Sequence, residues 1–325
     1  MGQPPEIVGV RCAQCLLVPA DWFGPCESAG ECWVELSRTV TVQVRVEVAD
    51  RVMGVCMYEG REVFAQAPLA LVTAEIRLSY EPRLNDTATR DTFAQAVREH
   101  LPILESEQFV SLSFQGASGQ VTEETLPQLR ALNPEKTASV TLNANALTVQ
   151  IVEYEHFGAF LNLVTVCLQA LPRVVPGALV RRVGLRYINE IRVPGGVTDT
   201  REWSKWLSSD LLAAFSLLPD QPVGGLNGSV LFHLDQERNV LLRWGEVVGR
   251  SILVPTIPLR RPELTEGRFF LLDTDSFWEP GSPQSLDVPR LTDELGHLHV
   301  PVGRIFLASL TDEVKALFRG RDSGA

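Results

Sequence analysis

Two aspartates near the C-terminus are the sharpest candidates for chemistry. Asp273 and Asp275 are separated by one residue within an apolar stretch typical of a β-strand. Residues i and i+2 of a strand point to the same face, so both carboxylates could bind one divalent cation. Glu246 and Glu279 could add oxygen ligands if neighbouring strands place them there. The structural alternative is that these acids cap turns or pair with arginines.

A second candidate set lies in the apolar stretch 179–193. Arg186 and Glu190 are expected on one face of a strand, with Ile188 between them, and Tyr187 and Asn189 on the other face. A buried Arg186–Glu190 ion pair would fix the strand register. A catalytic interpretation has Arg186 bind an anion and Glu190 act as a general base.

The two C-terminal histidines are two residues apart. On a helix, His297 and His299 would face different sides, which disfavours a shared metal ion. We expect His299 to form a hydrogen bond in the core or toward the Asp273 region, and a catalytic role is the alternative. The sequence contains no nucleophile elbow, phosphate-binding loop, HExxH motif or dinucleotide fingerprint, and it assigns no cofactor.

Composition changes abruptly at Met57. All three methionines and five of the six cysteines lie at or before this residue, and only Cys167 follows it. We therefore treat residues 1–56 as a doubtful cysteine-rich extension. The interpretation that we favour is a start codon assigned too early.

Four of the N-terminal cysteines allow another interpretation. Cys12 and Cys15 have the spacing of a zinc knuckle, with Cys26 and Cys32 as the second pair. The second pair is more widely spaced than usual, which weakens this hypothesis. A disulfide-bonded secreted segment is a third alternative, although no signal peptide precedes it.

Composition also limits the class of protein. The chain has 325 residues, a net charge of −11 and 45% hydrophobic residues, enough for a core of ordinary size. The acidic balance disfavours nucleic-acid binding, which needs a basic face. A run of 18 apolar residues is missing, so we expect no membrane span and a cytoplasmic protein. The oligomeric state stays open.

Hydrophobic periodicity predicts a mixed fold. Helices are expected over residues 91–101, 157–171, 202–218 and, with interruptions, 287–318. Strands are expected over residues 70–80, 109–115, 138–154 (two strands), 179–193, 229–234, 240–248, 251–255 and 267–277. Residues 116–134 are expected to form a surface loop or a short helix. Cys167 is expected in the core, and Thr311 as the N-cap of the last helical segment.

This order predicts an α+β fold of two consecutive halves, each a mostly antiparallel sheet flanked by helices. The expected domains are residues 57–195 and 196–325, divided at Pro194-Gly195-Gly196.

Three segments resemble one known family. The central segment GLRYINEIRVP (184–194) resembles the signature of a sporadically distributed bacterial family of unknown function. PLALVTAEIR (68–77) resembles its opening strand. FLLDTDSF (270–277), with the later Leu298-His299 and Leu310-Thr311, resembles its C-terminal pattern. The resemblance covers about residues 62–320, implies no activity, and suggests an accessory gene in a mobile-element or phage-defence context.

We therefore expect a bacterial accessory protein that acts by binding, without a self-contained catalytic site. The alternatives are a metal-dependent enzyme built on Asp273, Asp275 and Glu190, and a subunit of a complex with a protein partner.

Overall fold

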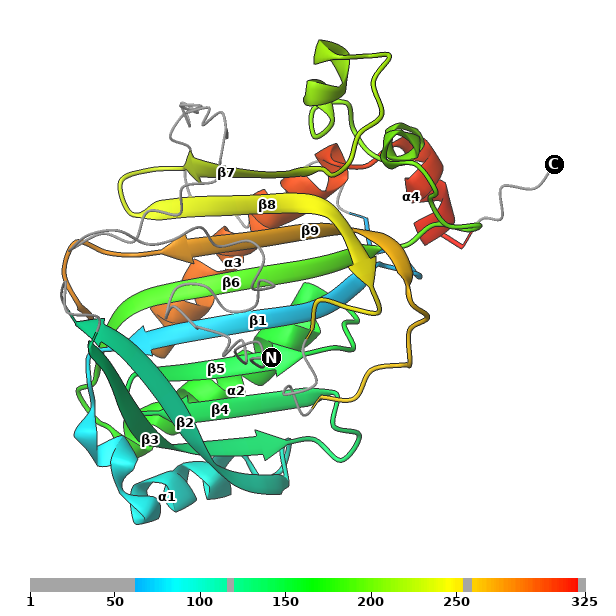
Figure 1. Ribbon diagram of the computed structural model, residues 1–325. Coiled ribbons are helices and arrows are strands. Elements are labelled where there is room, and N and C mark those ends of the chain that lie inside the picture. The colour runs from blue at the N-terminus through cyan, green and yellow to red at the C-terminus, as the bar shows by residue number, and fades with distance from the viewer. Residues whose placement is uncertain (1–61, 116–119, 254–258, 321–325) are drawn as a thin grey trace, which may run out of the picture.

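A computed structural model describes residues 62–115, 120–253 and 259–320 (Figure 1). The expectations for residues 1–56, including the zinc knuckle of Cys12, Cys15, Cys26 and Cys32, lie outside the described residues.

One large antiparallel sheet organises the chain (Figure 1). Its strands lie in the order β2-β3-β4-β5-β1-β6-β9-β8-β7, and β10 pairs with β6. Every pairing is antiparallel. The strands are β1 (Leu69–Leu78), β2 (Ile103–Gln115), β3 (Gln120–Leu132), β4 (Ala138–Asn143), β5 (Ala146–Ile151), β6 (Leu179–Ile191), β7 (Asn227–His233), β8 (Arg238–Gly249), β9 (Gly267–Trp278) and β10 (Gln284–Ser285).

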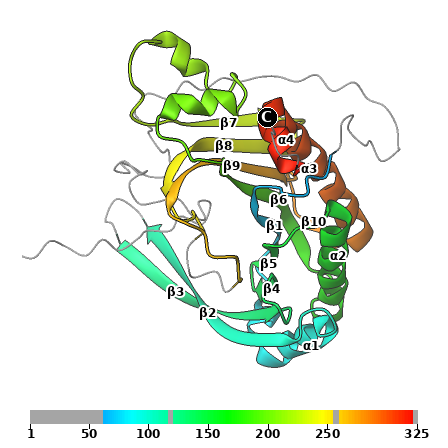
Figure 2. The same ribbon diagram turned by 90° about the vertical axis from the view of Figure 1, so that its right-hand side faces the viewer.

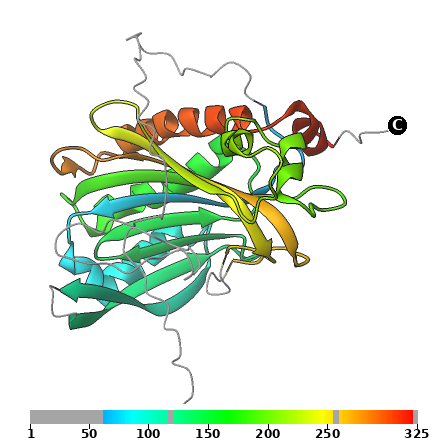
Figure 3. The same ribbon diagram turned by 45° about the horizontal axis from the view of Figure 1, so that its top comes forward.

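Three helices cover one face of this sheet (Figure 2). They are α1 (Thr87–Val97), α2 (Phe157–Val174) and α3 (Val288–Ala308), and α3 runs along the sheet behind β6 and β9 (Figure 3). The main core lies between the helices and the strands. A short helix, α4 (Asp312–Phe318), and three 3₁₀ helices complete the elements in the described part of the chain (Pro82–Asn85, Thr200–Lys205 and Ala213–Leu217).

The alternation in β1 shows how the sequence divides the two faces. Val72, Ala74 and Ile76 are fully buried under the helices, whereas Thr73 and Glu75 point to the other face. The strand predicted at residues 70–80 is therefore confirmed, and so is the division of its side chains between the two faces. The α+β class and the antiparallel pairing are confirmed as well.

The apolar helix α2 packs into the core as predicted. Its buried residues include Phe160, Cys167 and Leu168, and burial raises the pKa of the Cys167 thiol to about 12. By length and composition alone α2 is apolar enough to cross a membrane, but in this fold its apolar face packs on the sheet.

The division into two halves is not confirmed. Strand β6, from the first expected half, pairs along its length with β9 from the second. One continuous sheet therefore contains strands from both sides of Pro194-Gly195-Gly196, and the boundary at this position stays a prediction.

The helix predicted over residues 202–218 is wrong. Two 3₁₀ helices occupy this region, at Thr200–Lys205 and Ala213–Leu217. Between them Leu207 forms a β-bridge with Leu310, and the backbone N–H of Ser208 donates to the carbonyl of Ser309 at 2.9 Å. These distant partners take the backbone groups that a continuous helix would need.

Residues 116–134 were expected as a loop or short helix, but most of them form β3. This strand pairs with β2 over its whole length, and its last residues also pair with β4. Pairing on both sides stabilises an extended backbone that the polar local sequence does not favour.

The strand expected at residues 251–255 is also corrected, because residues 251–253 form a bend. The Glu190 carboxylate accepts hydrogen bonds from the Ser251 hydroxyl and the Ile252 N–H, which diverts this backbone from a strand ladder.

At the C-terminus, the helical region 287–318 has fewer interruptions than predicted. Helix α3 runs unbroken from Val288 to Ala308, with Gly296, Pro301 and Gly303 inside it. Thr311 is confirmed as the N-cap of α4, because its side chain accepts a hydrogen bond from the Val314 N–H.

We predict that an ion pair between β8 and α3 is critical for stability. Arg238 donates from Nε and Nη2 to the buried Glu294 carboxylate at 2.6 and 2.7 Å. Glu294→Ala removes the buried partner and leaves Arg238 only its partly exposed ion pair with Asp235, so we expect it to lower the free energy of unfolding by about 3 kcal/mol. Urea denaturation measures this change.

The matched control is Glu263→Ala, which removes one partner of the exposed Arg250–Glu263 pair. Screening by water makes such pairs weak, so this variant should unfold as the wild type does. Equal destabilisation by both variants would contradict the prediction.

Candidate ligand-binding face

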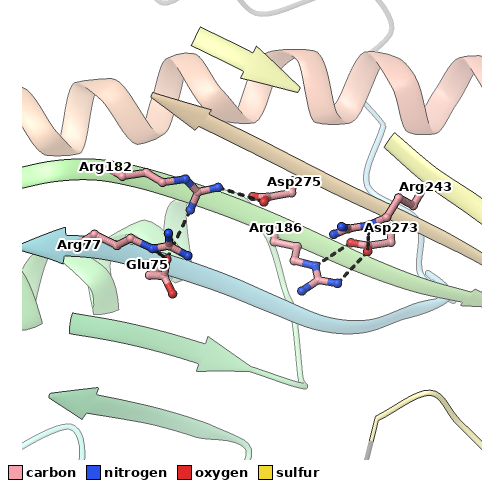
Figure 4. Close-up of polar contacts among 7 residues, drawn as sticks. All are labelled: Glu75, Arg77, Arg182, Arg186, Arg243, Asp273 and Asp275. Atoms are coloured by element: carbon pink, nitrogen blue, oxygen red, sulfur yellow. Dashed lines mark hydrogen bonds and ion pairs between the residues drawn. The ribbon is translucent and has the colours of Figure 1, made fainter. Parts of the chain in front are cut away.

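The sheet curves around the side opposite its helices (Figure 2). We call this side the concave face. Its central strands place charged residues at the positions that alternate with the core, and seven of them form what we call the arginine–carboxylate network (Figure 4). The network consists of Glu75 and Arg77 on β1, Arg182 and Arg186 on β6, Arg243 on β8, and Asp273 and Asp275 on β9.

Asp273 is the most buried member of the network. Its carboxylate accepts two hydrogen bonds of 2.7 Å from Nε and Nη2 of Arg186. Nε of Arg243 donates a third at 3.0 Å from the opposite side. Burial acts to raise the pKa of Asp273, but the two guanidinium groups outweigh it and hold the pKa below 3.8. Asp273 therefore stays charged at neutral pH and links β6, β9 and β8.

Arg182 organises the other half of the network. Its Nη2 donates to Asp275 at 3.0 Å and its Nη1 to Glu75 at 3.3 Å, so one guanidinium spans β1, β6 and β9. Glu75 also accepts a hydrogen bond from Nε of Arg77. The Arg182 guanidinium lies 4.5 Å from the ring centroid of Phe277, which gives it a cation–π contact as well.

Gly184 makes room for this arrangement. A Cβ atom at residue 184 would lie 2.6 Å from Nη1 of Arg182. The missing side chain therefore lets the Arg182 guanidinium lie flat over the strand between its two carboxylate partners.

The fold shifts the pKa values of the two aspartates in opposite directions, lowering that of Asp273 and raising that of Asp275. Burial raises the pKa of Asp275 and outweighs the opposing influence of Arg182 and Arg186, and the nearby Asp273 charge adds to the rise. Among the described residues, one oxygen of Asp275 receives a hydrogen bond, from Arg182, whereas both oxygens of Asp273 are bound. Neighbouring carboxylates on one strand therefore have different electrostatic environments.

The predicted Arg186–Glu190 ion pair is wrong. The two residues do share a face, but four residues along a strand span about 13 Å, beyond the reach of a direct contact. Arg186 binds Asp273 instead, and Glu190 forms an ion pair with Arg261 at 3.3 Å.

Glu190 anchors two described stretches, residues 251–253 and 259–261, on the concave face. Besides its ion pair with Arg261, its carboxylate accepts hydrogen bonds from the Ser251 hydroxyl and the Ile252 N–H. Apolar side chains of these stretches pack on those of the sheet. This small cluster contains Ile252, Leu253 and Leu259 from the two stretches, and Leu71, Leu132, Ile188 and Leu271 from the sheet.

His299 lies on the helix-covered side, away from Asp273. Its Nδ1 is 3.1 Å from the Tyr187 hydroxyl, and its ring stacks on Phe157 with centroids 4.0 Å apart. His297 is exposed on α3. The expected separation of the two histidines is confirmed, and the alternative contact between His299 and the Asp273 region is wrong.

The proposed metal ligands are only partly brought together. Asp273 and Asp275 share a face as expected, but arginines bind both. Glu246 lies on the opposite face, where it pairs with Arg268 at 2.6 Å and accepts a hydrogen bond from the Trp203 indole at 2.7 Å. Within the described residues, no group of three or more metal-binding side chains was found.

The arginine partners Arg182 and Arg243 were not among the candidates predicted from the sequence, and Glu75 and Arg77 had no predicted role. The available signal was the regular placement of charges on the polar positions of predicted strands, as in Glu75-x-Arg77.

Neither a scan against protein-family models nor a search of curated proteins finds a match to this chain. The resemblance to a sporadically distributed bacterial family therefore stays a prediction.

We predict that Asp273→Asn and Asp275→Asn have different effects on stability. Asp273→Asn leaves two guanidinium groups sharing a neutral partner, and we expect a loss of about 3–5 kcal/mol at pH 7. Asp275→Asn removes a carboxylate whose charge the fold disfavours, so its loss should be much smaller. Denaturant unfolding at several pH values measures both effects.

The pH dependence gives an independent check. The folded pKa of Asp273 is lowered, so its contribution is complete above about pH 4 and lost as the pH falls further. The difference in free energy of unfolding between the wild type and Asp273→Asn should therefore narrow below about pH 4. The folded pKa of Asp275 is raised, so its charge costs stability above that pKa. Identical pH profiles for the two variants would refute this assignment.

Proposed function

We propose that this protein acts by binding, and that the arginine–carboxylate network on the concave face contacts the ligand. The observation that carries the proposal is the concentration of seven charged side chains on the face opposite the helices. Ion pairs of this kind contribute little to stability, because removing charges from water offsets most of their attraction. A sheet face that served only to stabilise the fold would not need these ion pairs. A face that recognises a ligand does need charged groups held in place.

The network is also suited to binding because its arginines are held in place. Arg186 is fixed by two hydrogen bonds to Asp273, and Arg182 by Glu75, Asp275 and the Phe277 ring. A side chain that is already ordered loses less conformational entropy when a ligand binds. The same argument explains the position of Gly184, which gives Arg182 its space.

A metal-dependent enzyme built on Asp273, Asp275 and Glu190 is the less favoured alternative. Each of these carboxylates already pairs with a guanidinium group, so a cation would have to displace an arginine or lie beside one. A subunit of a larger complex is the other alternative. The exposed side chains of Leu217 and Leu218 are the clearest apolar pair for such a contact.

The resemblance supports the proposed setting, which is a cytoplasmic bacterial accessory protein in a mobile-element or phage-defence context. The division at residues 195 and 196 into two structural halves belongs to the same proposal.

The experiment is a thermal unfolding screen of the full chain with nucleotides, dicarboxylates, inorganic phosphate and divalent metal ions. A ligand present at about 100 times its dissociation constant stabilises the folded state by about 2.7 kcal/mol. We expect at least one anionic compound to stabilise the wild type. Gly184→Val, which keeps every charge but displaces Arg182, should reduce that stabilisation.

Gly281→Val is the matched control, because a Cβ at this exposed position meets nothing within 4 Å. It should preserve the ligand response. Stabilisation that neither Gly184→Val nor Arg243→Gln reduces would contradict binding on the concave face. Stabilisation by Mg²⁺ or Mn²⁺ that Asp273→Asn abolishes would favour the enzyme alternative.

A further inference from the structure

Arg243 differs from its neighbours in the network in how it uses its guanidinium group. Its Nε donates to Asp273, and this is its one hydrogen bond in the described part of the chain. Both Nη groups are therefore left without a protein acceptor there. A quarter of the side chain, 25%, is exposed to solvent, so these groups are accessible to a ligand.

The orientation of Arg243 is set by a fixed partner. Asp273 is held from the other side by both hydrogen bonds from Arg186, and its side chain is 4% exposed. A buried carboxylate that cannot move holds the Nε edge of Arg243. The other edge of the planar guanidinium, with its two Nη groups, then points away from Asp273.

The register of the sheet places a hydroxyl beside this arginine. Ser229 on the edge strand β7 lies directly opposite Arg243 on β8. Side chains of directly opposed residues in an antiparallel pair point to the same face, with Cβ atoms about 5 Å apart. Ser229 is partly exposed and can donate its hydroxyl proton.

The charges in the two halves of the network also differ. Around Arg182, two carboxylates, Glu75 and Asp275, face two arginines. Among the described residues, the Asp273 carboxylate is shared by Arg186 and Arg243. Within this part of the network, a further negative charge beside Arg243 is therefore electrostatically favoured.

We propose that Arg243 and Ser229 bind an oxyanion of the ligand, a phosphate or carboxylate group, on the concave face at β7 and β8. The proposal rests on the proposed binding function and adds the chemical class of the ligand. The two Nη groups of an arginine form a fork that matches two oxygens of either anion. The hydroxyl of Ser229 supplies a further donor.

The experiment is a calorimetric titration of the full chain with two probes, inorganic phosphate and succinate. Loss of a charged hydrogen-bond donor typically weakens binding by about tenfold or more. We expect Arg243→Gln to weaken the binding of the preferred probe by at least this factor, and Ser229→Ala to weaken it by several-fold. Ser229→Ala keeps Arg243 and its ion pair, so it remains informative if Arg243→Gln does not fold.

The control is Arg290→Gln, which makes the same charge change on α3. Arg290 is exposed there and lies against Trp278, away from the concave face. This variant should bind both probes as the wild type does. A preference for phosphate would indicate a phosphorylated ligand, and a preference for succinate a carboxylate ligand. Either preference supports the proposal if Arg243→Gln and Ser229→Ala weaken the binding of the preferred probe.

Three results would overturn the proposal. The first is that neither probe binds the wild type in the millimolar range. The second is that Ser229→Ala and a folded Arg243→Gln bind as the wild type does. The third is that Arg290→Gln weakens binding equally, which would indicate general attraction by net charge. A ligand whose binding depends on Gly184 but not on Arg243 would overturn this inference alone and leave the proposed binding function in place.

Discussion

The Asp273 carboxylate is the charge on which the concave face depends. It accepts hydrogen bonds from Arg186 on β6 and Arg243 on β8, and it lies on β9 between them. Three neighbouring strands are therefore linked by one buried anion. Because removal of that anion leaves two cations competing for a neutral group, the position of both arginines depends on it. Arg182 repeats the arrangement with opposite sign, since one guanidinium there links two carboxylates.

The two faces of the sheet have different roles. The helix-covered face carries the main core, in which β1, β6 and β9 pack against α1, α2 and α3. That core stabilises the strands and so fixes the spacing of the charges on the reverse side. The concave face contributes less apolar contact, and Ile252, Leu253 and Leu259 cover part of it beside the residues that Glu190 anchors. Rigid strands under a polar surface are well suited to holding recognition groups in place.

Local sequence patterns predicted the helices, strands and caps that are determined by residues close together in the sequence. The alternation of residues 70–80 predicted β1, the apolar stretch around Cys167 predicted α2, and Thr311 was recognised as a helix cap. The sequence also indicated that Arg186 and Glu190 share a face. Their partners were not predictable, because Arg186 and Asp273 are 87 positions apart and meet only when β6 pairs with β9. The failed helix at residues 202–218 has the same origin, since its backbone pairs with residues near Leu310.

The central claim is that a ligand binds through the arginines of the concave face. The most direct measurement is NMR of the arginine side-chain N–H groups in the full chain, with and without the ligand that stabilises it most. The account predicts that the signals of Arg182, Arg186 and Arg243 shift on binding while that of Arg290, on the helix-covered side, stays in place. Shifts confined to arginines outside the concave face would contradict it.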